Sequence, residues 1–292
     1  MKRLVAWLRM GRPLILPGGI LAYGLGLAMG YWHAGSFVWG PALAGFIVTE
    51  VTNLVAHYAD EYADVDTDTL TRRTWFSGGS GVLPAGLVPG SWALRSAVVL
   101  AILAVALTAA FIAIGLLSPH AGWIVGLGLL GGWFYSMPPI QLERRGLGEL
   151  DNALLGGILM PLMGYTTQVG RPTILALVAL LPIFVMVLVN LLGVHWTDRQ
   201  ADAAVGRRSL VVITGERVRG LYHALVVFAY LLVLGLTGWI LPLPVTAALL
   251  LTLPVSLWAA LTFARQPSPV PSALAMAVAI AAATAGWVVA AA

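Results

Sequence analysis

The sequence predicts an all-α protein that crosses a membrane many times, and three observations lead to this prediction. Of the 292 residues, 60% are hydrophobic and only 10% are charged, whereas soluble domains carry about 25% charged residues. Apolar stretches recur along the chain, and a membrane-spanning helix needs roughly 20 apolar residues. Lysines and arginines gather between alternate stretches, as expected when cytoplasmic loops carry the positive charge. The solvent around this chain is therefore a lipid bilayer.

The N-terminal half contains four predicted spans, most of them separated by turn-forming residues. His33-Ala34-Gly35 ends the first span, and Ser118-Pro119 ends the third. A long polar stretch follows the second span. The fourth span is short and rich in glycine, so its sequence signal is the weakest. The four ranges are Leu14–Trp32, Phe37–Tyr58, Trp92–Leu117 and Ala121–Tyr135.

The C-terminal half contains five further predicted spans, again divided by glycine and proline. Gly170-Arg171-Pro172 follows the fifth span, and Pro242 follows the seventh. A polar segment with basic residues follows the sixth. The five ranges are Leu150–Val169, Ile174–Trp196, Leu221–Trp239, Leu243–Phe263 and Ser272–Ala291. Because no linker separates the spans, we expect one domain over residues 1–292 with nine transmembrane helices.

The basic residues also predict an orientation. If the N-terminus is cytoplasmic and each helix crosses once, all 16 lysines and arginines except Arg171 fall on the cytoplasmic side. The net charge of +4 therefore reports orientation and gives no reason to expect a nucleic-acid partner. We expect a bacterial or archaeal inner-membrane protein with its C-terminus outside. The absence of cysteine excludes disulfides and thiolate metal sites.

An acidic stripe ends the second predicted span. Five of the twelve acids fall within the nine residues 60–68. On a helix, four polar residues spaced by four, three and four positions share one face. Asp66 and Asp68 then belong to the following loop, away from that face. The residues on the shared face are Asn53, His57, Asp60 and Asp64.

A second stripe ends the sixth predicted span and matches the first. Asp198 and Asp202 are four residues apart, and His195 lies one turn before them. Like charges at that spacing repel each other, so a bound cation is the natural compensation. Carboxylate and amide oxygens are ligands that Mg²⁺ accepts. We therefore expect the two stripes to face each other across one cavity and to hold divalent metal. The alternative is a pair of solvated helix ends.

Three predicted cytoplasmic loops add basic residues near these acids. A loop rich in serine and glycine exposes backbone N–H groups, and arginine pairs well with phosphate. Acids for metal, arginines for phosphate and an apolar membrane interior suit a substrate with a diphosphate head and an apolar tail. Taken alone, each loop also fits a simple role in setting topology. The loop residues of interest are Arg72, Arg73, Tyr135, Arg144, Arg145, Arg207 and Arg208.

These motifs resemble the UbiA superfamily of membrane prenyltransferases. The first stripe is similar to that family's Asn/Asp-rich motif, and residues 198–210 are similar to its Asp-x-x-x-Asp motif and following loop. Arg9 and Arg12-Pro13 resemble the segment before its first helix, and residues 135–149 resemble its loop between helices 4 and 5. Within the superfamily, residues 53–83 look closest to the 1,4-dihydroxy-2-naphthoate prenyltransferases of menaquinone synthesis.

The resemblance implies nine helices around a central cavity capped by cytoplasmic loops. It also implies that a prenyl group passes from an isoprenyl diphosphate to an aromatic precursor of a lipid quinone. Two Mg²⁺ ions are implied, one held by Asp60 and Asp64 with Asn53, the other by Asp198 and Asp202. The arginines of the three loops, with Tyr135, would bind the substrate.

The sequence departs from the family pattern at several positions. His57 and His195 replace residues that are often Asp or Asn, and Pro139 replaces a lysine found in some members. Either histidine could act as a base, hydrogen-bond the acceptor or orient an aspartate. Two other functions remain open: a terpene cyclase that needs no acceptor, and a cation-coupled transporter. Transporter sites lie near the bilayer midplane on broken helices, unlike these helix-end acids.

Overall fold

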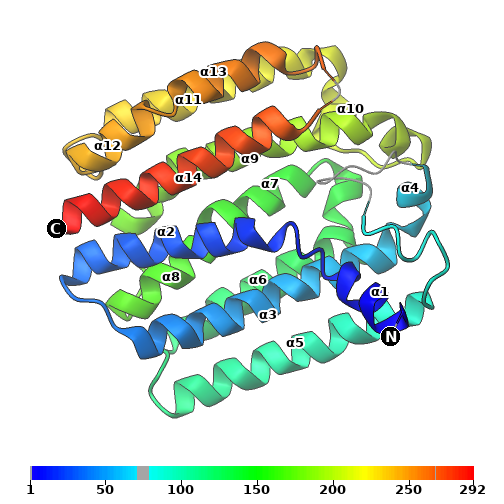
Figure 1. Cartoon of the computed structure of the whole chain (residues 1–292), viewed down its shortest axis with the longest axis horizontal. Helices are drawn as coiled ribbons and strands as arrows, with labels where there is room; N and C mark the ends of the chain where they lie inside the picture. Colours follow the sequence, from blue (N-terminus) through cyan, green and yellow to red (C-terminus); the bar gives the residue numbers. More distant parts are fainter. Residues whose placement is uncertain (1, 71–78, 267) are drawn as a thin grey trace.

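The structure is a computed structural model that describes residues 2–70, 79–266 and 268–292. The regular secondary structure of the described residues is helical, apart from an isolated bridge between Thr237 and Leu241. The helices run side by side, and the two chain ends lie at opposite ends of the molecule (Figure 1). The elements in chain order are α1 (Lys2–Met10), α2 (Leu16–Ala34), α3 (Trp39–Ala63), α4 (Val65–Leu70), α5 (Gly90–Ala113), α6 (His120–Ser136), η1 (Leu142–Arg145), α7 (Gly148–Leu154), η2 (Leu155–Leu159), α8 (Met160–Val169), α9 (Ile174–Ala204), α10 (Leu210–Thr214), η3 (Gly215–Arg217), α11 (Val218–Leu236), α12 (Leu243–Leu250), α13 (Leu253–Thr262) and α14 (Val270–Ala291).

Every predicted span overlaps a helix of the structure, although the helices differ in how well they suit a bilayer. Among the described residues, five segments are long and apolar enough to cross a membrane. The other predicted spans coincide with α2, α3, α6 and the run from α7 to α8. The count of nine crossings therefore remains a prediction. The five segments are Gly90–Ala113, Ile174–Ala204, Leu210–Leu236, Leu243–Thr262 and Val270–Ala291.

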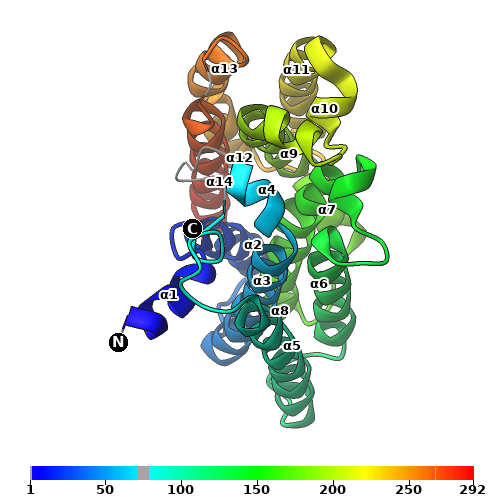
Figure 2. The same ribbon diagram turned by 90° about the vertical axis from the view of Figure 1, so that its right-hand side faces the viewer.

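Helix α9 lies at the centre of the bundle, whereas α5 lies at its edge. In the apolar window of α9, 56% of residues are buried, compared with 17% for α5. Figures 1 and 2 both show α5 at one margin and α11 with α13 at the other. The side of α5 that is buried carries small residues, Ala93, Ala97 and Ala104, against α3. Its larger aliphatic side chains point outward, as expected for a helix that faces lipid.

Helices α2 and α8 approach closely because each places glycine at the contact. A Cβ atom at Gly26 would lie 1.7 Å from the carbonyl oxygen of Pro161, and one at Gly164 would lie 2.3 Å from that of Tyr23. Small residues at such positions let helix backbones pack together in a membrane. This contact fixes α8 against α2 and α3, and it helps to define one wall of the interior.

Short elements gather at the end of the bundle where the polar motifs lie. Figure 2 looks onto this end, with α4 near its centre and α1 and α10 around it. Helix α4 contacts α9, and α1 contacts α3 and α5. Helix α7 continues through the π-helical turn η2 into α8. Such π turns often occur at functional sites.

Candidate functional site

One cavity of about 620 Å³ lies among α2, α3, α6, α9 and α14, with η2 in its wall. Its volume is within the range of small-molecule sites, which is roughly 300–1,000 Å³. Most of the lining is apolar, and the polar lining comes mainly from two helices. Those polar residues are Asn53, His57, Asp60 and Asp64 on or at the end of α3, and Asn190, His195, Asp198 and Asp202 on α9. The structure therefore brings the two stripes to a single cavity.

The two helices carry the same order of side chains along the cavity wall. On α3 the order is Asn, His, Asp, Asp with spacings of four, three and four, and on α9 the spacings are five, three and four. At a rise of 1.5 Å per residue, each set extends over roughly 16–18 Å. Asn190 completes the second set, and sequence reasoning missed it because the five-residue step breaks the expected spacing. Its side chain is 8% exposed, and its Oδ1 has no hydrogen-bond partner among the described residues.

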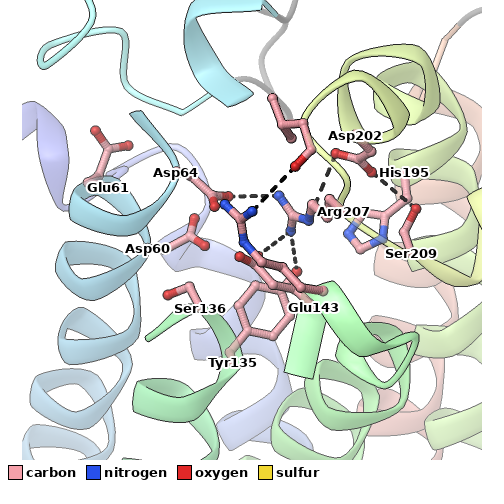
Figure 3. A network of polar contacts seen from close by, with 12 residues as sticks. Asp60, Glu61, Asp64, Tyr135, Ser136, Glu143, His195, Asp202, Arg207 and Ser209 are labelled. Carbon is pink, nitrogen blue, oxygen red and sulfur yellow. Dashed lines mark hydrogen bonds and ion pairs between the residues drawn. The ribbon is translucent and has the colours of Figure 1, made fainter. Parts of the chain in front are cut away.

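Arg207 lies at the centre of the acidic end (Figure 3). Its guanidinium is 2.7 Å from Asp64 Oδ2, 2.5 Å from Glu143 Oε2 and 3.8 Å from Asp202 Oδ1. It also donates a hydrogen bond of 3.1 Å to the hydroxyl of Tyr135. Burial opposes its charge, but the surrounding carboxylates, Asp64 first, raise the pKa of Arg207 above its ordinary value. Arg207 is therefore a buried cation shared by several acids.

Arg12 forms a second buried ion-pair cluster next to the first. It lies 2.7 Å from Asp60 Oδ2 and 2.8 Å from Glu61 Oε1. Glu61 is 1% exposed and also accepts hydrogen bonds from the backbone N–H and the hydroxyl of Ser80. Against the effect of burial, Asp60 and Glu61 raise the pKa of Arg12. The Arg12 side chain thus ties the segment before α2 to the end of α3.

The two histidines have different surroundings. His195 Nδ1 lies 2.9 Å from Glu149 Oε1, which also accepts a hydrogen bond of 2.8 Å from the Leu210 N–H. This carboxylate orients the imidazole of His195 and joins α7, α9 and α10. Nε2 of His57 is buried without a hydrogen-bond partner in the described part of the chain. Both rings line the cavity.

A group of three carboxylates fits a divalent cation. Oxygens of Asp60, Asp64 and Glu143 lie within 4.8 Å of one another. Asp60 Oδ1 is buried without a hydrogen-bond partner over residues 2–70, 79–266 and 268–292. Burial first, and then the neighbouring carboxylates, raise the pKa of Asp64 and of Glu143. Oxygen ligands with excess negative charge suit Mg²⁺, so the donor set matches the predicted metal. Glu143 was not among the predicted ligands.

The remaining predicted residues lie in several places. Arg72 and Arg73 lie outside the described residues. Arg208 and Arg145 are exposed, and Arg145 donates a hydrogen bond to the Pro139 carbonyl. Arg144 is half-buried and donates a long hydrogen bond, 3.4 Å, to the Val205 carbonyl. The described cavity lining includes Tyr135 and Arg207 but not these three arginines.

The expectation that Asp68 points away from the site is wrong. Residues 65–70 form α4, which returns Asp68 to the cavity lining, while Asp66 is exposed. Gly79 packs against this carboxylate: a Cβ atom there would lie 1.8 Å from Asp68 Oδ2. Gly79 has a φ of 59°, which favours glycine. A short helix after the stripe was not evident from charge spacing alone.

Sequence and structure comparisons place this chain among known membrane proteins. The family model for the UbiA prenyltransferase family matches residues 20–282. None of the curated proteins matches the chain in sequence.

Three solved structures share the fold over nearly the whole chain. A UbiA homologue from Archaeoglobus fulgidus, solved with GPP and Mg²⁺, is 16% identical with a TM-score of 0.71, covering 96% of this chain and 99% of that one. A UbiA homologue from Aeropyrum pernix K1, solved in its apo form, is 18% identical with a TM-score of 0.64, covering 92% and 97%. A structure of digeranylgeranylglyceryl phosphate synthase is 16% identical with a TM-score of 0.68, covering 99% of both chains.

Proposed function

Because this chain belongs to the UbiA prenyltransferase family and is a prenyltransferase, we propose that it carries out Mg²⁺-dependent transfer of a prenyl group from an isoprenyl diphosphate to an aromatic acceptor within the membrane. One observation carries this proposal: carboxylates from α3 and α9 line the same cavity, with the buried guanidinium of Arg207 between them. Such a site can hold both metal and diphosphate.

The acidic end of the cavity would bind the diphosphate. Asp60 and Asp64, with Asn53, would hold one metal ion, and Asp198 with Asp202 would hold a second. Bound metal would supply Lewis-acid charge neutralisation of the leaving diphosphate. Arg207 would pair with phosphate oxygens, since guanidinium matches their geometry. The Archaeoglobus fulgidus homologue, which was solved with GPP and Mg²⁺, supports this substrate class.

Further arginines would take part from the loops at the same end. Arg72 and Arg73 follow the first stripe, and Arg208 follows Arg207. Arg144 and Arg145 lie on η1, close to the chain segment that carries Arg207. We propose that these side chains contact the diphosphate from the cap, where positive charge lowers the cost of bringing a polyanion to buried carboxylates.

The apolar part of the cavity would hold the isoprenoid tail. Several lining residues just before α2, on α2 and on α14 are also exposed on the outside of the bundle: Leu14, Leu21, Val270 and Leu274. Exposed apolar side chains that also line a cavity indicate an opening to lipid between these two helices. A substrate with a long hydrocarbon tail could enter there without crossing water.

The chemistry would proceed by ionisation of the allylic diphosphate. The bond between the prenyl C1 and the diphosphate oxygen breaks, and the diphosphate leaves with the electron pair. The ring of Tyr135 would face the resulting cation, a contact worth about 2 kcal/mol when desolvated. A ring carbon of the acceptor then forms the new C–C bond, and the displaced ring proton passes to a base. His57 and His195 are the candidate bases because both line the cavity.

We further propose that the acceptor is a naphthoate-like precursor of a lipid quinone, as in menaquinone synthesis. The residues that support this are those of the first stripe and the following Ser77-Gly78-Gly79-Ser80-Gly81 segment. The protein would function in a bacterial or archaeal inner membrane with its N-terminus cytoplasmic and its C-terminus outside, as the basic residues predict.

The direct test incubates the purified protein with Mg²⁺, a labelled isoprenyl diphosphate and a panel of aromatic acceptors. We expect a prenylated acceptor to form, and we expect excess EDTA to stop its formation. Release of diphosphate with a cyclised hydrocarbon and no prenylated acceptor would instead identify a terpene cyclase. Ion flux in liposomes without any turnover would support the transporter and overturn the proposal.

A further inference from the structure

Glu143 is a carboxylate that the loop between α6 and α7 directs into the site. It lies on η1 and is only 1% exposed. Gly146 follows with a φ of 77°, and a Cβ atom at Gly148 would lie 2.8 Å from the Glu143 Cα. Both glycines are therefore required where the loop folds back on itself. Apart from the facing carboxyl of Asp64, Glu143 Oε1 has no partner among the described residues.

We propose that Glu143 is a third ligand residue of the metal site, and that Arg207 competes with the metal for the same carboxylates. The inference rests on the proposed function, because it concerns the metal that would activate the diphosphate. In the structure Arg207 contacts Asp64 and Glu143 directly (Figure 3). Two of the three carboxylates that fit a cation are thus already paired with Arg207, and the third, Asp60, is paired with Arg12.

Charge explains why the two cations exclude each other. Asp64, Glu143 and Asp202 share the single positive charge of Arg207, so the cluster holds more acidic groups than this one guanidinium can neutralise. A divalent cation on Asp60, Asp64 and Glu143 would neutralise their carboxylates more fully than the guanidinium does. It would also repel a guanidinium held within a few ångströms in a buried setting. Arg207 would therefore leave the carboxylates as metal binds.

The released guanidinium has a second use. Arginine pairs with phosphate oxygens in the same forked geometry that it uses with carboxylates. Arg207 would thus be held inside the cavity by Glu143 and Asp64 until metal arrives, and would then be available to the diphosphate. Metal would bind before diphosphate in this order of events. Through a shared metal ion, Glu143 would also link its own loop, between α6 and α7, to the carboxylates at the end of α3.

The test measures Mn²⁺ binding to the full chain in detergent, without isoprenyl diphosphate, by electron paramagnetic resonance. We expect Glu143→Gln to weaken Mn²⁺ binding by about tenfold or more, as loss of a supporting carboxylate commonly does. We expect Arg207→Gln to strengthen it by about tenfold, because the competing cation is gone. Arg207→Lys, which keeps a cation, should stay close to the wild-type affinity.

Matched controls come from an exposed acid and an exposed base on η3. Glu216 and Arg217 lie outside the cavity lining, so Glu216→Gln and Arg217→Gln should not change Mn²⁺ affinity. If Glu143→Gln binds Mn²⁺ like the wild type, Glu143 is not a ligand. If Arg207→Gln binds Mn²⁺ equally or more weakly, the guanidinium does not compete. Either result overturns the inference.

A prenyl-transfer assay on the same samples separates this inference from the proposed function. Wild-type protein that forms no prenylated product with any acceptor would refute the function, whatever the Mn²⁺ affinities show. Active wild type together with unchanged Mn²⁺ affinity in either variant would refute the inference alone.

Discussion

The pKa of the Asp68 carboxyl depends on the other charged groups of the site. It lines the cavity beside Asp60 and Asp64, and Arg12 is the cation that offsets it. Burial, and then the charge of Asp60, raise the pKa of Asp68 to about 8, although Arg12 opposes the shift. With a pKa of about 8, Asp68 is mostly protonated at neutral pH.

This shift predicts the pH dependence of metal binding. A divalent cation favours deprotonated carboxylates, so binding must release protons at neutral pH. Apparent Mg²⁺ affinity should therefore rise between about pH 6 and pH 8, by up to about tenfold per pH unit for one proton released, and should level off above that range. The effect of pH on the stability of the metal-free protein has the opposite sign. The contribution of Asp68 to the free energy of unfolding falls as pH rises from about 4 toward 8, because the unfolded chain loses this proton at lower pH than the folded protein does.

Calorimetric titration of Mg²⁺ at several pH values checks this prediction. Asp68→Asn should flatten the rise, since it removes one of the titrating groups. Asp66→Asn should leave the rise unchanged, because Asp66 is exposed on the same short helix. Equal affinity at about pH 6 and about pH 8 in the wild type would show that no raised carboxylate is linked to the metal.

Individual residues also mark where sequence reasoning reaches its limit. The helical spacing of Asp60 with Asp64, and of Asp198 with Asp202, was sufficient to predict that each pair shares a face. Helical spacing could not predict which arginine of the following loop is buried and which is exposed. Arg207 is buried and Arg208 is exposed, because the turn at Gly206, with a φ of 73°, sets which side chain points inward.

At the scale of elements, the contact between α2 and α8 depends on glycine at two positions. A side chain at Gly26 has no space, since even a Cβ atom would meet the Pro161 carbonyl at 1.7 Å. Gly24 on the same helix has nothing within 4 Å of a Cβ atom. The two positions form a matched pair for testing whether this contact holds the fold.

We expect Gly26→Ala to destabilise the protein by about 3 kcal/mol or more, because a well-packed contact must separate. This corresponds to a fall of about 5–10 °C in the thermal unfolding midpoint. Gly24→Ala should leave the midpoint unchanged or raise it, since alanine favours helix. Thermal unfolding in detergent measures both variants. Equal midpoints for the two would contradict the packing described for α2 and α8.

Apolar patterning predicted the long helices but not the short elements between them. The apolar stretches predicted the positions of the long helices, because burial in lipid requires continuous hydrophobic residues. The short elements α4 and η1 were not predicted. Their positions depend on long-range ion pairs and on glycine turns, as with Glu143 on η1 and its contact with Arg207. Such contacts leave no periodic pattern in the sequence.

In the whole molecule, two largely apolar helices each turn a polar stripe toward one cavity. Helices α3 and α9 are far apart in the sequence, yet both carry Asn, His and paired Asp residues along the same cavity. The pairing of the stripes was predicted from their similarity and from the family resemblance. The cavity shape required the structure, because it depends on how all the helices pack.

We propose that the two stripes form one site for metal and diphosphate. The most direct test is calorimetric binding of an unreactive isoprenyl thiodiphosphate, with Mg²⁺ present, to the wild type, Asp60→Asn, Asp198→Asn and the double variant. If the stripes act together, each single variant should lose about 100-fold in affinity and the double variant should lose little more, since residues of one site are not additive. Losses that simply add, or a single variant that binds like the wild type, would contradict a shared site.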